Sequence, residues 1–513
     1  MNTLLLPLLV ALPFVGSIGI YLTRGRLKQR QIYTMALTLL TTALTWLLIL
    51  NRPEGSFVLL QFTSELSIAF KLDGFGCLFA GMVSILWPLA TLYAFEYMAH
   101  ASRRNTFYTF YIMTYGVTLG VALSANMLTM YIFYELLTLV TLPLVIHELG
   151  HDAMFAGRKY LRYSLGGSAL AFLGLVYLIT FADAGTFVLG GDLNAVMASE
   201  HRSALLVVYV LSFLGFGVKA AVFPVHGWLP TAGVAPTPVT ALLHAVAVVK
   251  AGVFAITRLT YYCFGTEFLS GTWAQYTVLG LAIFTIFYGS SMAVKERHFK
   301  RRLAYSTVSN LSYILFGICL MNPVGMAAGL LHMLFHSVMK ILGFLSAGSA
   351  IHRSGREYIF QLDGLGRKMP VTFLCLTIAG LGLTGVPLFA GFISKWQLAQ
   401  AAVETADVFS ASAAASSAAS FSWLPILGMA VLLISALLTA IYMMTIAIRA
   451  FVHPFDAAAL PAGAAHGTHG GDVHESGWCI LLPLCIFAVL VIVFGVYPQP
   501  LMELVTAIAQ GTF

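Results

Sequence analysis

LSFLGFGVKAAVFPVHGWLP, residues 211–230, is apolar enough to enter a membrane, yet it holds a lysine and is interrupted by proline. Lys219 lies near its middle, Pro224 follows five residues later and Pro230 ends it. Proline inside a span leaves backbone groups without helical partners, which is tolerated where protein or cavity water satisfies them. The stretch therefore predicts a broken membrane helix with a buried charge beside the break.

The composition indicates that this stretch belongs to a membrane protein. Of 513 residues, 59% are hydrophobic and only 9% are charged, which is too apolar for a soluble fold. Fourteen apolar runs of spanning length follow one another, at approximately 3–23, 32–50, 72–95, 107–125, 127–146, 161–182, 204–224, 237–258, 273–294, 303–321, 324–347, 370–403, 422–448 and 477–497. We therefore predict an all-α polytopic membrane protein with about fourteen transmembrane helices and no separate soluble domain.

A second span carries the same kind of break. Residues 370–403 are overlong for one straight crossing, and the segment LGLTGVPLFAGFISKW places Gly385 and Pro387 before Lys395. If spans 4–8 and 9–13 are two five-span units, the broken, lysine-bearing span is the fourth in each. Because five is odd, the second unit enters the membrane with the opposite orientation. This order predicts two inverted five-helix repeats with broken helices 7 and 12.

The same order divides the chain into four parts. Residues 1–106 hold helices 1–3, and residues 107–258 hold the first five-helix repeat, helices 4–8. Residues 259–450 hold the second repeat, helices 9–13. Residues 451–513 hold a histidine-containing loop, helix 14 and a short C-terminal tail.

The basic residues predict the orientation of the chain. With the N-terminus outside, the loops on the cytoplasmic side carry 19 lysines and arginines. The opposite loops carry only Arg52, Lys71, Arg202 and Arg258. The positive-inside rule therefore predicts that both termini lie outside and that the histidine-containing loop is cytoplasmic.

Five ionisable residues lie inside the predicted spans. Four are lysines, and of the 20 acids only one, in FYELLTLVTLPLV at 133–145, lies deep in a span. The five are Glu135, Lys219, Lys250, Lys340 and Lys395. An ionisable group in the bilayer core is costly unless it is paired or hydrated, so each is a candidate functional residue. The alternative for any one of them is snorkelling or a structural ion pair, but five together favour a path for protons or other ions.

Histidines accompany these lysines. In LHMLFHSVMK, His332, His336 and Lys340 are spaced i, i+4 and i+8, so they share one stripe of span 11. His244 precedes Lys250 in span 8. Histidine titrates near neutrality and desolvation lowers the affinity of a lysine for its proton, so these side chains can relay protons. The alternative is that the histidines only hydrogen-bond carbonyl groups of neighbouring helices.

The sequence predicts no cofactor, metal or nucleic-acid site. A GxGxxG pattern at residues 380–385 lies inside an apolar span, with neither a preceding strand nor an acidic partner for a ribose. The six cysteines show no CxxC spacing. His466, His469 and His474 lie in a small, polar loop, for which a solvated linker is favoured over metal binding.

Four long motifs are similar to the antiporter-like membrane subunits of respiratory complex I. They are FYELLTL with Glu135, GVKAAVFPVHGWLPTAGVAPTPVTALLHAVAVVKAGVF with Lys219 and Lys250, LLHMLFHSVMKILGFLSAGSAIH with Lys340, and GLTGVPLFAGFISKW with Lys395. The same pattern occurs in Mrp-type sodium/proton antiporters and in energy-converting membrane-bound hydrogenases. The resemblance covers roughly residues 70–450, and it also implies fourteen helices with two inverted repeats.

The resemblance implies a role for each candidate residue. Glu135 pairs with Lys219, and His244 lies beside the central Lys250. The connection in span 11 is formed by His332, His336 and Lys340, and Lys395 leads to an exit. Some family members carry glutamate in span 12, so Lys395 places this chain with the lysine-bearing branches. The chain ends about sixteen residues after span 14, which favours a middle-type complex I subunit or the D-type subunit of an Mrp antiporter or hydrogenase.

These observations predict an ion-translocating subunit without a redox centre or a catalytic site of its own. The favoured hypothesis is a proton-translocating subunit of a redox-driven complex I-like or membrane-bound hydrogenase complex, with sodium as a second candidate ion. The alternative is the D-type subunit of an Mrp sodium/proton antiporter, and a more distant one is a structural scaffold. The expected partners are other membrane subunits and the lipid bilayer of a prokaryotic inner membrane.

Overall fold

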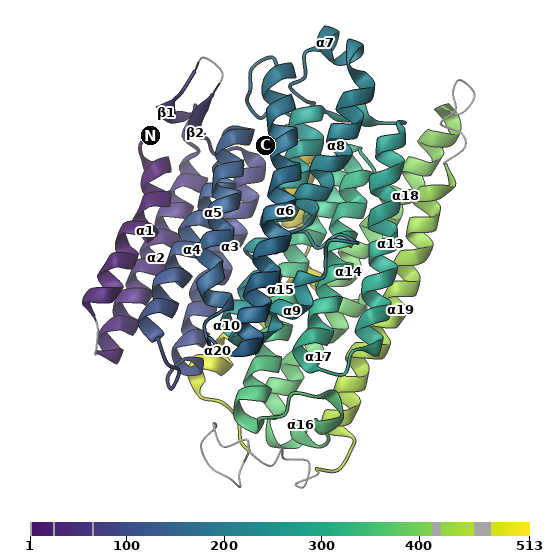
Figure 1. The fold of residues 1–513 in the computed structure, drawn as a ribbon. Helices are drawn as coiled ribbons and strands as arrows, with labels where there is room; N and C mark the ends of the chain where they lie inside the picture. The colour runs from purple at the N-terminus through teal and green to yellow at the C-terminus, as the bar shows by residue number, and fades with distance from the viewer. Residues whose placement is uncertain (1–2, 24–25, 64–65, 413–421, 456–472) are drawn as a thin grey trace.

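Long helices lie side by side in the computed structural model (Figure 1), which describes residues 3–23, 26–63, 66–412, 422–455 and 473–513. The chain begins at one edge of the bundle, and α18 (Ala390–Ser412) and α19 (Trp423–Phe451) lie at the opposite edge. The helices between these edges carry the candidate site.

Each of the fourteen predicted spans coincides with one helix or with a broken helix. The unbroken ones are α1 (Leu5–Leu22), α2 (Leu27–Asn51), α3 (Gly74–Tyr97), α4 (Arg104–Ala122), α5 (Met127–Val145), α6 (His151–Phe181), α13 (Trp273–Lys295), α14 (Phe299–Cys319), α15 (Pro323–Ser354), α19 and α20 (Trp478–Val496). The broken ones are span 7, with α8 (Arg202–Gly217) and α9 (Trp228–Thr231); span 8, with α10 (Thr237–Ala245), α11 (Val248–Thr257) and the π-helix η2 (Arg258–Phe264); and span 12, with α17 (Pro370–Thr384) and α18. The polytopic helical fold is thus confirmed.

Shorter elements connect these spans. They are α7 (Ala195–Glu200), η1 (Ala232–Val234), α12 (Thr266–Leu269), η3 (Ile359–Gln361), α16 (Leu365–Lys368), α21 (Gln499–Gln510) and the strands β1 (Phe57–Gln61) and β2 (Ser67–Phe70). The two strands pair antiparallel, with Phe57 opposite Phe70. This hairpin between α2 and α3 was not predicted.

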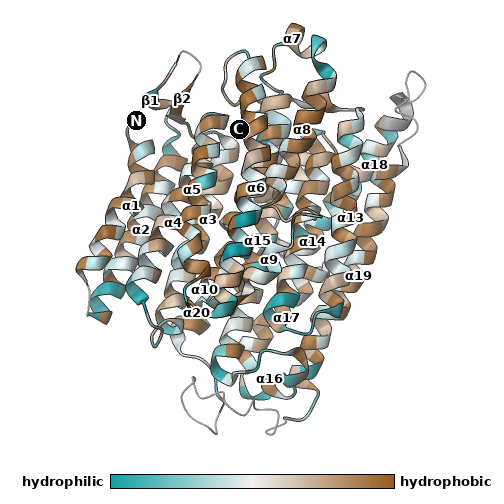
Figure 2. Cartoon of the chain, in the orientation of Figure 1, coloured by the Kyte–Doolittle hydropathy of each residue, from teal (hydrophilic) through white to brown (hydrophobic). Residues whose placement is uncertain are grey.

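The bundle encloses most of two of its spans. Ten helices in the described part of the chain are long and apolar enough to cross a membrane, and in two of them, Thr237–Phe264 and Pro323–Ser354, 100% of the most apolar window is buried. Figure 2 shows hydrophobic residues along α1, α6 and α19, and hydrophilic ones gathered near α16 and the lower ends of α1 and α2. Spans 8 and 11 therefore form an interior layer shielded from lipid by the other helices.

Both predicted breaks are present. After α8, residues 218–227 are irregular and include Pro224; there Trp228 donates from Nε1 to the carbonyl of Val218 at 2.7 Å and the Phe223 amide donates to Thr285 Oγ1 at 3.1 Å. In span 12, Gly385 ends α17 with φ +89°, and Pro387 lies in the link to α18. Neighbouring side chains thus satisfy backbone groups that the break frees.

Span 8 has a third break, which was not predicted. α10 ends at Ala245, α11 begins at Val248, and the amides of Val246 and Ala247 both donate to the carbonyl of Leu242. The intervening residues include neither glycine nor proline, so the sequence carries no local signal for the break. It separates His244 from Lys250.

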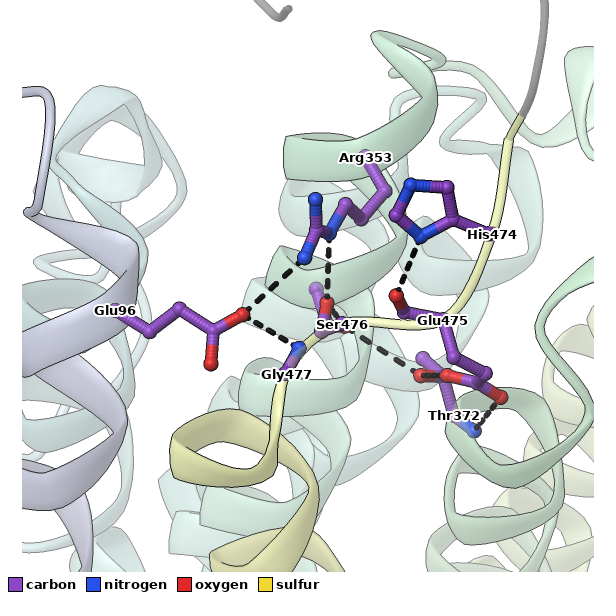
Figure 3. Close-up of polar contacts among 8 residues, drawn as sticks. Glu96, Arg353, Thr372, His474, Glu475, Ser476 and Gly477 are labelled. Carbon is purple, nitrogen blue, oxygen red and sulfur yellow. Dashed lines mark hydrogen bonds and ion pairs between the residues drawn. The ribbon is translucent and has the colours of Figure 1, made fainter.

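Two carboxylates hold the segment that leads into α20 in place through hydrogen bonds (Figure 3). Glu96 of α3 accepts hydrogen bonds from the amide of Gly477 at 2.6 Å and from Arg353 at 3.3 Å. Glu475 accepts from the amides of Val371 and Thr372, at 2.6 and 3.1 Å, in the first turn of α17. The second contact caps the N-terminus of that helix with a negative charge.

Replacing Glu475 by alanine should destabilise the fold by about 1–2 kcal/mol, because α17 loses its cap and a favourable charge at its positive end. Thermal unfolding of the purified chain measures this as a lower midpoint. Glu503→Ala is the matched control, since Glu503 is exposed on α21. Equal midpoints for the two variants would show that the cap contributes nothing.

Candidate ion-translocation site

Lys250 and His336 join the two enclosed spans. Lys250 of α11 hydrogen-bonds Nδ1 of His336 on α15, and neither side chain is exposed. A buried lysine–imidazole contact is a place where a proton can be shared or transferred, since each group can hold it. This contact was not predicted as a pair, although both residues were predicted as site residues.

His332 continues the line from His336 toward α18. The two imidazole rings stack with centroids 6.0 Å apart, and His332 Nδ1 hydrogen-bonds Ser394 Oγ at 2.9 Å. The ring of Tyr313 lies 5.3 Å from that of His332. The predicted i, i+4 stripe of α15 therefore faces buried groups on α11, α14 and α18.

Lys395 follows Ser394 and occupies the break of span 12. Its ammonium group donates to the carbonyls of Leu383 and Thr384 at 2.7 and 3.1 Å, and it lies 5.1 Å from the centre of the Tyr313 ring. The last carbonyls of a helix lack helical partners and carry partial negative charge. The break thus provides the binding site for the lysine, and Tyr313 borders both His332 and Lys395.

Lys340 lies one turn beyond His336 on α15 and is fully buried. It donates to the carbonyl of Leu303 at 3.2 Å and to Ser306 Oγ at 2.8 Å, and Tyr442 donates to the same Ser306 oxygen at 2.7 Å. Lys340 is therefore bound by neutral oxygens of α14 rather than by a carboxylate.

His244 is the least satisfied member of the set. Its ring is fully buried, with its centroid 4.6 Å from that of the Phe344 ring, and neither ring nitrogen has a hydrogen-bond partner among the described residues. Buried polar atoms are nearly always paired, with protein or with ordered water. A water molecule or a movement of the ring is the physical means of satisfying His244.

Glu135 and Lys219 are electrostatic neighbours rather than a contact pair. Lys219 is fully buried, hydrogen-bonds the carbonyl of Tyr134 and lies 3.3 Å from the centre of the Tyr134 ring. Its charge acts on Glu135, but within the described chain the two form no ion pair at 4.0 Å or less. Glu135 Oε1 has no hydrogen-bond partner there. The pairing implied by the family resemblance would need the lysine to move.

Gly252 connects the two groups of charges. It lies in α11 two residues after Lys250, and a Cβ built on it would come within 2.8 Å of the carbonyl carbon of Lys219. The backbone at the span-7 break therefore packs directly on α11. The segment that holds Lys219 and the helix that carries Lys250 are therefore in direct contact.

Lys300 belongs to the same interior but was counted as a loop residue. It is 8% exposed and donates to the carbonyl of Ala235 at 3.2 Å, and its charge acts on both His244 and Glu357. The hydrogen bond from His298 and the nearby Lys300 charge lower the pKa of the Glu357 carboxyl in its surface loop. The basic run KERHFKRR hid this role, because a charge run normally marks a solvated segment.

Arg258, which the loop count placed outside, is fully buried in the π-helix. It forms two hydrogen bonds to Asp73, at 2.5 and 2.6 Å, and its guanidinium carbon lies 4.4 Å from the centre of the Tyr262 ring and 4.7 Å from that of Phe187. Asp73 also accepts from the amide of Gly76 and caps α3. The pair fixes the end of span 8 to the start of span 3.

A family comparison covers all eight ionisable candidates. The model of the NADH:quinone oxidoreductase/Mrp antiporter transmembrane family matches residues 124–422, the range from before Glu135 to beyond Lys395. The chain belongs to this family.

Two curated relatives are components of cation/proton antiporters. The A/B-type component of a probable K(+)/H(+) antiporter from Rhizobium meliloti is 33% identical over 413 residues, 78% of this chain and 40% of that protein. The A-type component of the Na(+)/H(+) antiporter from Alkalihalophilus pseudofirmus is 30% identical over 467 residues, 86% of this chain and 55% of that protein. The chain thus spans about half the length of the curated relatives it matches. Neither of the two is named as a D-type component.

Two solved structures share the fold of this family member. A chain of the Mrp complex from Dietzia sp. DQ12-45-1b superposes with a TM-score of 0.82 at 22% identity, covering 98% of this chain and 97% of that one. A chain of the membrane-bound sulfane sulfur reductase, an archaeal respiratory membrane complex, gives 0.81 at 23% identity, covering 100% and 98%. Both belong to multisubunit membrane assemblies.

The histidine-containing loop is the segment for which the sequence left metal ligation open. His466 and His469 lie outside the described residues, and the ring of His474 hydrogen-bonds the carbonyl of Glu475 at 2.9 Å. In the described ranges, no three His, Cys, Asp or Glu side chains are placed to hold a metal ion.

Proposed function

We propose that the chain translocates protons as the antiporter-like subunit of a multisubunit cation/proton exchanger of the Mrp type. The observation that carries the proposal is the buried Lys250–His336 contact, which links two spans that lipid does not reach. Groups that change charge are costly in such an interior and are retained where an ion must pass.

The proposed path runs along α15 and into the break of span 12. A proton passes between Lys250 and His336, then to His332, and reaches Lys395 through the region that Ser394 and Tyr313 border. Water completes the steps that the side chains do not bridge directly. Lys340, bound to neutral oxygens of α14, is a second proton carrier on the same helix.

Glu135 and Lys219 act as the coupling element in this proposal. Moving the ammonium group from the Tyr134 carbonyl toward Glu135 would form the ion pair that is absent at rest, and the packing of Gly252 on Lys219 would pass that movement to α11. A closer carboxylate stabilises the charged lysine, whereas desolvation favours the neutral one. The change in pairing would thereby bias the proton held at Lys250.

The relatives favour gradient-driven exchange over redox-driven pumping, the hypothesis first favoured by the sequence. Both curated relatives named above are antiporter components, and their names indicate an alkali cation as the second ion. A redox-driven complex is the second candidate, because the fold equally matches a chain of the sulfane sulfur reductase. In either assembly the partners are other membrane subunits of a prokaryotic inner membrane.

The orientation and the repeat also belong to this proposal. With both termini outside, Glu357 and Lys300 lie on the cytoplasmic side of His244, and Lys395 leads toward the outside. The two five-helix units at 107–258 and 259–450 would then supply half-channels that open to opposite faces. Breaks at the fourth span of each unit support this division.

Replacing Lys250 by methionine should reduce cation-dependent proton exchange about a hundredfold, the lower limit of what one positioned proton-transfer group contributes. The assay follows dissipation of a pH gradient in everted membrane vesicles after addition of sodium or potassium, with the chain expressed beside its neighbouring subunits. Lys28→Met is the matched control, because Lys28 is exposed at the start of α2. Unchanged exchange in the Lys250 variant would overturn the proposed path.

The composition of the purified complex separates the two candidate assemblies. An exchanger contains only membrane subunits, whereas a redox-driven complex brings iron–sulfur or nickel–iron subunits with it. Copurification of such subunits would replace the exchanger proposal with the redox-driven one.

A further inference from the structure

A polar pocket of about 460 Å³ lies at one face of the bundle, where α1 ends and where α2 and α4 begin. Its lining includes Tyr21 from α1, Arg30 from α2, and Arg103 and Arg104 at the start of α4. Figure 1 shows these three helices side by side at one edge of the bundle. The pocket is far along the chain from every residue of the ion path.

Three arginines meet in this pocket without a counter-charge. Arg30, Arg103 and Arg104 form no ion pair with any described carboxylate, and Arg30 and Arg104 are close enough to repel each other. Arg30 is 5% exposed, and its Nε has no hydrogen-bond partner among the described residues. Like charges held together around a space with one donor unsatisfied favour an anion within that space.

The end of α4 adds further donors. Its N-cap, Arg103, provides no side-chain cap, so the first amides of a 19-residue helix are left to bind a ligand. Arg30 hydrogen-bonds Asn105 Oδ1, which holds its guanidinium group beside this helix end. A helix N-terminus together with arginine side chains matches the oxygen atoms of a phosphate group in both charge and geometry.

The position of the pocket and the side chains around it suit a lipid headgroup. It lies at the ends of membrane-spanning helices, and the side chains of Ile18 and Leu22 on the adjoining turn of α1 are 65% and 87% exposed. Apolar side chains beside a cluster of arginines suit acyl chains below a phosphate.

We propose that the pocket formed by Tyr21, Arg30, Arg103, Arg104 and the N-terminus of α4 binds the phosphate of an anionic phospholipid. The charged headgroup enters the pocket and the acyl chains run along α1. The site stands independently of the ion path, and it would be occupied in a transport-inactive variant as well.

The test measures stabilisation of the full chain, purified with its membrane subunits in detergent. Phosphatidylglycerol, phosphatidylcholine and inorganic phosphate are titrated separately, and the rise in unfolding temperature gives an apparent affinity for each. We expect the largest rise with phosphatidylglycerol. The Arg30→Gln and Arg104→Gln variants should each weaken its apparent affinity about tenfold, as loss of a charge-assisted hydrogen bond does.

Arg26→Gln is the matched control, since it removes the same charge from an exposed residue of the same turn. An equal response of Arg26→Gln and the two pocket variants would overturn the site. A full rise with inorganic phosphate would overturn the lipid assignment, because a free anion would then suffice. Measuring Arg104→Gln as well as Arg30→Gln guards against a folding defect, since Arg104 is only half-buried.

Discussion

Replacing Lys219 by methionine is expected to reduce cation-dependent proton exchange by about two orders of magnitude, within the range that one positioned proton-transfer group contributes. Methionine keeps an unbranched apolar stem but removes the charge that lies 3.3 Å from the Tyr134 ring and acts on Glu135. The carboxylate would then lack the cation with which it couples. Gradient dissipation in everted vesicles measures the loss, and the amount of assembled complex is measured in parallel.

Lys219→Arg distinguishes proton coupling from a structural ion pair. Arginine keeps the positive charge but does not release a proton at physiological pH. If Lys219 must change its charge, the arginine variant should assemble normally and remain inactive. Exchange at the level of the unmodified chain would show that a fixed charge suffices. Lys71→Arg, at an exposed residue, is the control for the substitution itself.

Asp73→Asn should be the most destabilising single change at the Arg258–Asp73 pair. Removing one partner of a buried ion pair costs about 3–5 kcal/mol, because the other charge is left uncompensated. The side chain of Arg258 is 1% exposed and that of Asp73 is 25% exposed, so only an orphaned carboxylate can reach water. We therefore expect a lower unfolding midpoint for Asp73→Asn than for Arg258→Gln.

The double variant Asp73→Asn/Arg258→Gln tests the cause of that difference. With both charges removed, no ion is left buried alone, and the midpoint should recover above that of Asp73→Asn. Size-exclusion chromatography of heated, detergent-solubilised protein measures the folded fraction of each variant. Equal midpoints for both single variants would mean that burial of the guanidinium group carries no penalty here.

The sequence could predict the features that have a local cause. Pro224 has no amide hydrogen to donate, and Gly385 adopts a left-handed backbone without steric cost, so both favour a break, and the breaks of spans 7 and 12 were predicted and are present. The break between Ala245 and Val248 has no such residue, so no local signal predicts it.

The sequence predicted which residues belong to the candidate site, but not which of them contact one another. The cost of an ion in a bilayer identifies lysines, histidines and an acid inside apolar runs. Which of them touch depends on how the spans pack. The spacing of residues along the sequence could not predict the hydrogen bond between Lys250 and His336. Nor could it predict that Lys219 hydrogen-bonds the Tyr134 carbonyl and not Glu135. Lys300 and Arg258 were missed because hydropathy assigns charged ends of spans to loops, whereas the fold buries them.

The enclosure of α15 limits how the proposed ion path can work. This helix packs against α3, α10, α14, α17, α18, α20 and α21, and every residue of its most apolar window is buried. A rod held on all sides in a close-packed interior cannot slide or tilt without displacing every neighbour. Rotating a ring or extending a lysine displaces far fewer atoms. In the proposed ion path, proton transfer along α15 would therefore rely on side-chain rotations about a helix that stays in place.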